Sequence, residues 1–111
     1  SSNQVTLDLS AAQTFTVTAD ADISEFVVSN PPTGSTNFTI KIMQDATGNR
    51  SVGIDTFKDS QNNSIPIYWP GGVVPVVTVG AGKSDIYSFK TFDGSNLTSG
   101  LYGVVGGQNF S

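Results

Sequence analysis

Residues 38–49 read FTIKIMQDATGN, and this stretch decides the fold class. Its large apolar side chains Phe38, Ile40 and Ile42 fall at every second position, and the residues between them are polar. A period of two puts alternate side chains on opposite faces of a β-strand. The pattern therefore predicts a strand with one buried face and one face in water.

The end of the same stretch predicts a turn. The Asp45 side chain can accept hydrogen bonds from the backbone that follows it, and Gly48 can adopt a positive φ angle. Apolar residues then resume at Val52 and Ile54. We therefore expect these two residues to return beside the first strand as its antiparallel partner in a hairpin.

The rest of the chain repeats this pattern of short strands and turns. Alternating segments at 5–9 and 15–17 are separated by the short polar link 10–13, which favours a second antiparallel hairpin. Further strands are predicted at 23–28, 65–69, 84–91 and 101–105.

Two segments are less regular. Residues 73–79 are rich in valine, but Pro75 has no backbone N–H to donate, which favours an edge position, a bulge or an extended stretch outside the sheet. The tail 106–111 is expected to be loose unless Phe110 docks on the domain.

These elements predict an all-β fold. No segment has apolar residues at helical spacing over several turns, and twelve glycines disfavour helices further. About eight short antiparallel strands separated by turns are typical of a β-sandwich, here expected to be jelly-roll-like. The length of 111 residues fits one domain spanning 1–111.

Composition disfavours several classes of function. The chain has no cysteine and no histidine, which removes disulfides, thiolate metal sites, cysteine nucleophiles and the usual base at neutral pH. The net charge of −4 disfavours a nucleic-acid partner. The longest apolar run, 71–79, is too short to span a bilayer, so no membrane association is predicted. We expect no enzymatic activity, no cofactor and no metal.

Two pairs of aspartates have the residue type needed for the acid and base of a glycosidase: Asp20 with Asp22, and Asp55 with Asp59. Carboxylates also bind calcium, but the chain has no EF-hand-like series of acids. Because aspartate is favoured wherever strands turn, we interpret all four residues as turn residues.

The sequence GAGKS at 80–84 has the residue types of a phosphate-binding loop. It lacks the required spacing to an earlier glycine, and no helix is expected after it. We interpret this segment as a turn.

Tyr68 and Trp69 have aromatic faces on which a sugar ring could stack. Trp69 also precedes the sharp bend Pro70-Gly71-Gly72, where a large ring can close the core. We favour the core interpretation of Trp69 and keep both residues as candidate contacts with a glycan or a protein partner.

Six short motifs follow one another along the chain. They are VTLD at 5–8, QDATG at 44–48, WPGG at 69–72, Pro75, DIYSF at 85–89 and GQNF at 107–110. In this order they resemble a β-rich module of phage virion proteins, which occurs in capsid decoration (cement) proteins and in tail-fibre-associated domains. Residues 61–68 depart from the module, because this link is longer and more polar than usual.

The resemblance implies a structural protein of the virion surface, with the head favoured over the tail. We expect a decoration protein that binds the major capsid protein and associates into a homotrimer. The alternative is a tail-fibre or receptor-binding module that recognises host-surface glycan, with Tyr68 and Trp69 as its stacking residues.

Overall fold

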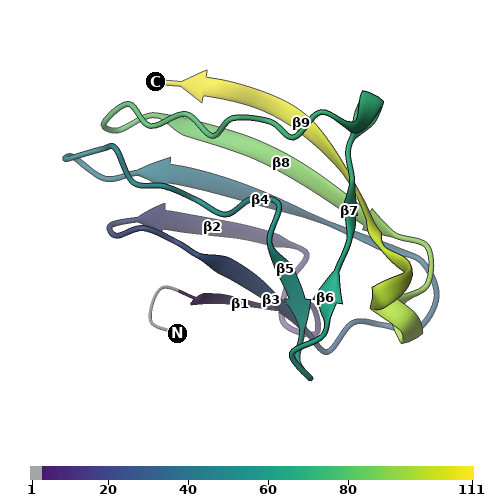
Figure 1. Ribbon diagram of the computed structural model, residues 1–111. Coiled ribbons are helices and arrows are strands. Elements are labelled where there is room, and N and C mark those ends of the chain that lie inside the picture. The colour runs from purple at the N-terminus through teal and green to yellow at the C-terminus, as the bar shows by residue number, and fades with distance from the viewer. Residues whose placement is uncertain (1–3) are drawn as a thin grey trace.

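The computed structural model describes residues 4–111, which form two packed β-sheets (Figure 1). The first sheet contains β1 (Gln4–Asp8), β3 (Glu25–Ser29), β5 (Phe57–Asp59) and β6 (Ser64–Ile65), in that order. The second sheet contains β2 (Thr14–Ala19), β4 (Thr36–Gln44), β8 (Ser84–Thr91), β9 (Leu101–Phe110) and β7 (Ile67–Tyr68), in that order. Two short 3-10 segments are η1 (Pro70–Gly72) and η2 (Gly94–Ser99). The predicted all-β sandwich is confirmed.

The first four strands alternate between the two sheets. β1 pairs in parallel with β3, and β2 pairs in parallel with β4. The predicted hairpin between 5–9 and 15–17 is therefore wrong, because these strands lie in different sheets. Crossing between the sheets after each strand brings alternate strands together in the same direction. The period of two identifies the buried face of a strand but does not identify its neighbour.

The sheets are mixed rather than antiparallel. Four of the seven pairings between the described strands are parallel: β1–β3, β2–β4, β3–β5 and β7–β9. The prediction of antiparallel strands is therefore wrong for these four pairings and correct for the other three. Jelly-roll connectivity depends on antiparallel neighbours, and these pairings do not support it.

The turn after β4 forms as expected, but the predicted hairpin does not. Asp45 Oδ1 accepts hydrogen bonds from the backbone N–H groups of Thr47 and Gly48, at 3.1 and 2.9 Å. The antiparallel partner of β4 is β8, however, and Val52 instead makes an isolated parallel bridge with Ile23. The predicted pairing of Val52 and Ile54 with β4 is wrong.

The side chain of Gln44 gives a physical reason for this path. Its amide nitrogen donates to the Arg50 carbonyl at 2.9 Å, and its oxygen accepts from the Arg50 N–H at 3.0 Å. This double contact holds the chain in a broad turn at the end of β4. The edge of β4 is thereby left to β8, which pairs with it along eight residues from Thr36↔Thr91 to Met43↔Ser84.

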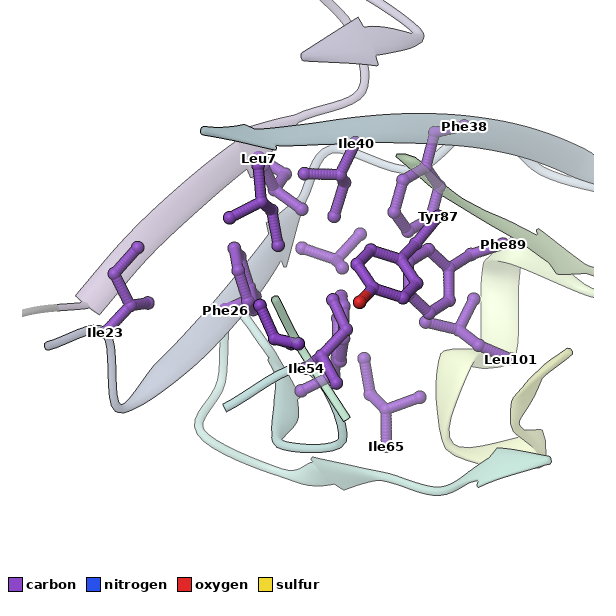
Figure 2. Packing of buried hydrophobic residues seen from close by; sticks show 14 of the residues in the cluster. Leu7, Ile23, Phe26, Phe38, Ile40, Ile54, Ile65, Tyr87, Phe89 and Leu101 are labelled. Atoms are coloured by element: carbon purple, nitrogen blue, oxygen red, sulfur yellow. The ribbon is translucent and has the colours of Figure 1, made fainter. Parts of the chain in front are cut away.

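The core lies between the two sheets, where side chains from both meet (Figure 2). Four buried rings form a continuous line across it. Phe26 and Phe57 of the first sheet stack at 5.2 Å between ring centroids, and Phe57 lies 4.9 Å from Phe89 of the second sheet. Phe89 in turn stacks on Phe38 at 5.4 Å. Aromatic pairs of this kind stabilise a core by more than the burial of their apolar surface alone.

The valine-rich segment 73–79 forms no strand and runs as an extended stretch outside the sheets, one of the three expected outcomes. The Val76 carbonyl accepts a hydrogen bond from the Gln108 side chain at 2.6 Å, which ties the segment to β9. β9 continues to Phe110, so the tail is ordered rather than loose, and the Phe110 ring lies against Gly107. The tail is held by pairing with β8, including Ser84↔Phe110.

Within residues 4–111, no helix has the length and apolar character needed to cross a membrane.

Candidate functional site

The outer face of the five-stranded sheet carries the candidate site. Paired residues of neighbouring strands point to the same face of a sheet. One row across β4, β8, β9 and β7 contains Asn37, Lys90, Tyr102 and Tyr68. The next row contains Thr39, Ser88 and Val104. These two rows place aromatic, polar and cationic side chains side by side on the surface.

An open groove of about 680 Å³ lies over these rows. Its lining includes Asn37, Ser88, Lys90, Phe92, Tyr102 and Val104. This volume falls in the range of sites that hold small molecules. The lining combines two exposed aromatic rings with an amide, a hydroxyl and an ammonium group, which are the groups needed to hold a polar ring-shaped ligand.

Tyr102 is the centre of an exposed aromatic cluster. Its ring centroid lies 5.2 Å from that of Tyr68 and 5.3 Å from that of Phe92, with the Phe92 ring perpendicular to it. The three side chains are 50%, 48% and 64% exposed, in the order Tyr102, Tyr68 and Phe92. Because the neighbouring rings support Tyr102 from two sides, it offers a preorganised apolar surface to a ligand.

The charge on this face is positive, although the chain is acidic. Lys90 Nζ lies 5.2 Å from the Phe92 ring centroid, within reach of a cation–π contact. Lys41 also points outward, one row beyond Thr39. None of the outward-facing residues in the described strands of this sheet is a carboxylate. Asp93, just beyond β8, accepts hydrogen bonds from the Ser95 N–H and hydroxyl.

The structure separates the two aromatic residues predicted as contacts. Trp69 is only 7% exposed, and its Nε1 donates to Asp55 Oδ1 at 2.7 Å. Its ring packs edge-on against Phe89 and Tyr87. The core interpretation of Trp69 is confirmed, and its faces are covered by protein. Tyr68 remains available on the surface, next to Tyr102.

Of the four aspartates considered as catalytic pairs, Asp20, Asp22 and Asp55 lie in a bend, a loop and a turn, and Asp59 is the last residue of β5. Asp22 accepts a hydrogen bond from the Ser51 N–H at 2.9 Å, and Asp55 accepts one from the indole N–H of Trp69. Asp59 Oδ1 closes the turn that follows it, accepting backbone N–H groups at 2.9 Å from both Gln61 and Asn63. The Asn63 N–H is the main reason why the pKa of Asp59 lies below its usual value. The turn interpretation is confirmed, and residues 4–111 contain no group of three or more acidic side chains placed to hold a metal ion.

The GAGKS segment at 80–84 is also a turn. The Lys83 N–H donates to the Gly80 carbonyl at 3.0 Å, and Gly82 has a φ of +71°. A strand, β8, follows it rather than a helix. The interpretation as a turn is confirmed.

A buried carboxylate that sequence reasoning did not single out organises the other side of the sheet. Asp85 is 1% exposed and accepts the Thr78 N–H and the Tyr87 hydroxyl at 2.7 Å each, and the Asn109 N–H at 2.9 Å. Burial acts to raise the pKa of Asp85, but these hydrogen bonds outweigh it and hold the pKa below its usual value. Burial, together with the bond to Asp85, raises the pKa of Tyr87.

Sequence reasoning also missed Phe92 and Tyr102. Tyr102 lies between Leu101 and Gly103, which are buried, so the alternation carried the signal that it points outward. Nothing in the sequence pattern indicated that Tyr102 would contact Tyr68, because this contact depends on the parallel pairing of β7 with β9. Comparisons with protein-family models, curated proteins and solved structures found no match to this chain.

Proposed function

We propose that this protein is a non-enzymatic structural protein of a phage virion, which decorates the head by binding the major capsid protein. The observation that carries the proposal is the exposed apolar segment 73–79. Val73 is 71% exposed and Val76 is 86% exposed, and Val74 and Val79 of the same segment are 44% and 43% exposed. Apolar side chains gathered on a surface mark sites of association with other proteins.

The valine segment is held in place by hydrogen bonds on its two sides. The Val76 carbonyl accepts from Gln108, and the Thr78 N–H donates to the buried carboxylate of Asp85. Val77, between them, is buried. A segment that is already ordered loses little conformational freedom when a partner covers it, which favours binding. The segment is therefore suited to act as a rigid contact ridge.

The hydrogen bonds of the aspartates support a structural use of these residues. Asp22 and Asp85 each accept backbone N–H groups from other segments of the chain, and Asp59 accepts those of the turn that follows it. A carboxylate engaged in this way favours the folded state and is not poised to transfer a proton to a substrate. This use agrees with a protein whose activity is adhesion.

Many identical copies bound to a repeating shell gain avidity from repetition, so each contact can be modest. Closed symmetry also covers sheet edges and apolar ridges that would otherwise associate without limit. We infer that the protein forms a homotrimer through the valine ridge, 73–79, and binds the capsid lattice in that form.

Light scattering tests the trimer. We expect a mass of three times the 11.6 kDa chain at micromolar concentration. Val76→Asp should shift the mass to that of one chain, because a charge would be buried in the interface. Ser35→Asp adds the same charge at an exposed position before β4 and should leave the trimer intact. A wild-type monomer that does not sediment with capsids lacking the protein would exclude this function.

The second candidate function is a tail-fibre or receptor-binding module that recognises host-surface glycan. The exposed cluster of Tyr68, Tyr102 and Phe92 favours it, because aromatic faces stack on the apolar faces of sugars. Trp69 no longer belongs to this candidate site, since it is buried. The position of the protein on the particle separates the two functions, because a receptor module lies at the tail.

A further inference from the structure

We propose that the outer-face groove binds an acidic saccharide, with a sugar ring stacked on Tyr102 and its carboxylate paired with Lys90. The inference rests on the second candidate function and specifies its ligand. It is also compatible with a protein carried on the head, because the groove and the valine ridge 73–79 are made by different residues.

The stacking part of the proposal comes from the arrangement of the rings. Tyr102 is half exposed and is supported by Tyr68 at 5.2 Å and Phe92 at 5.3 Å. A tyrosine supported on two sides loses little side-chain freedom on binding. A pyranose ring matches such a surface, since one of its faces carries mainly C–H groups while its hydroxyls point outward.

The polar neighbours of Tyr102 lie where sugar hydroxyls would need partners. Asn37 pairs with Lys90 across β4 and β8, in the same row as Tyr102. In the next row, the Ser88 and Thr39 hydroxyls lie 3.2 Å apart. An amide and two hydroxyls can each donate and accept hydrogen bonds, which suits a ligand that has several hydroxyls on its rim.

The charge of the face selects an acidic sugar over a neutral or cationic one. The chain carries nine acids and five bases, yet the outward-facing residues of the described strands in this sheet include two lysines and no carboxylate. Arg50 and Lys58 are paired with acids elsewhere, at 3.0 and 3.3 Å. Lys90 instead lies in the groove, over Phe92.

Lys41 extends this charge along the sheet. It lies four residues from Asn37 on β4, which corresponds to roughly 13 Å at the usual rise of a strand. An acidic oligosaccharide lying along β4 and β8 would therefore meet a second ammonium group. The overall charge of −4 would still repel a long, dense polyanion such as nucleic acid.

An NMR titration of the ¹⁵N-labelled full chain tests the proposal, with trigalacturonic acid as the probe and its neutral methyl ester as the matched control. We expect the acid to shift the backbone signals of Ser88, Lys90 and Tyr102. The ester should bind about threefold more weakly at low salt, since one exposed ion pair contributes little more than this. Added salt should remove most of the difference.

Three variants assign the effect to the groove. Lys90→Gln should weaken binding of the acid about threefold and leave the ester unchanged, whereas Lys83→Gln, the same change of charge in the turn before β8, should alter neither. Tyr102→Ser should weaken both ligands about tenfold. Its amide spectrum should otherwise match that of the wild type, which shows that the fold is kept.

Each contrary outcome has a definite meaning. Equal binding of acid and ester would overturn the acidic-ligand proposal but leave a glycan-binding module in place. No binding of either at millimolar concentration would overturn both the inference and the glycan candidate, without bearing on the capsid function. Shifts confined to residues outside the groove would also overturn the inference.

Discussion

The carboxylate of Asp85 lies 2.7 Å from the hydroxyl of Tyr87, two residues along the same strand, and both side chains are buried. The same carboxylate accepts N–H groups from Thr78 and Asn109. One side chain thus fastens the valine ridge 73–79 and the end of β9 to the core. The proposed contact surface with other proteins depends on this network.

Replacing Asp85 with Asn should destabilise the protein by about 3 kcal/mol, because charge-assisted hydrogen bonds become weaker and an amide NH₂ group faces donors. Urea unfolding at neutral pH measures this change in the free energy of unfolding. Asp20→Asn makes the same change of charge at an exposed bend and should have little effect. Equal stability of the two variants would show that the buried network does not stabilise the fold.

The same carboxylate should also contribute to a loss of stability at acid pH. The pKa of Asp85 in the folded protein lies below its usual value, as do those of Asp45 and Asp59. A group whose pKa is lowered by folding stabilises the protein above the unfolded pKa, and this contribution is lost as the pH falls through the folded pKa. The free energy of unfolding should be flat from about pH 7 to pH 5 and should fall below about pH 4.

The Asp85→Asn variant is the control for this pH dependence. Its free energy of unfolding should decline less steeply between about pH 4 and pH 2, because one of the titrating groups is gone. A wild-type protein whose stability rises on acidification would contradict the assignment of these carboxylates as stabilising hydrogen-bond acceptors.

The chain has a single tryptophan, so its fluorescence reports on Trp69 alone. Because the ring is 7% exposed and packed against Tyr87 and Phe89, we expect blue-shifted emission and weak quenching by acrylamide. Both properties should change to those of free tryptophan in concentrated urea. Strong quenching of the native protein would show that Trp69 is exposed, and Trp69 would then again be a candidate sugar contact.

Gly94 should be the glycine least tolerant of a side chain. A Cβ at this position would lie 1.8 Å from the Pro32 carbonyl oxygen, so Gly94→Ala must displace backbone and should cost about 3 kcal/mol of stability. Gly80→Ala is the matched control, because its Cβ would meet only the flexible side chain of Lys83. We expect that variant to stay within about 0.5 kcal/mol of the wild type in thermal unfolding.

The positions of the strands were largely predictable from the sequence. β8 was predicted at 84–91 with the observed bounds, since turn residues flank it and its side chains alternate. The pairing of strands was not predictable in the same way. Val5 pairs with Phe26 rather than with the next strand, and this choice depends on how the two sheets pack, which a local pattern does not encode.

The candidate site was predictable only in part. Tyr68 was identified from its residue type, but its partners Tyr102 and Phe92 are brought to it by the pairing of β7 with β9 and by the turn after β8. Asp85 was seen only as the start of a strand, because an aspartate beside a turn is ordinarily exposed. Its burial is compensated by donors from Thr78, Tyr87, Gln108 and Asn109, which the fold brings together around its carboxylate.

The most direct test of the proposed function is electron microscopy of intact phage particles labelled with a gold-conjugated antibody against this chain. The proposal predicts regularly spaced label over the head, with none on the tail. Label confined to the tail tip, or particles that carry no label at all, would contradict it.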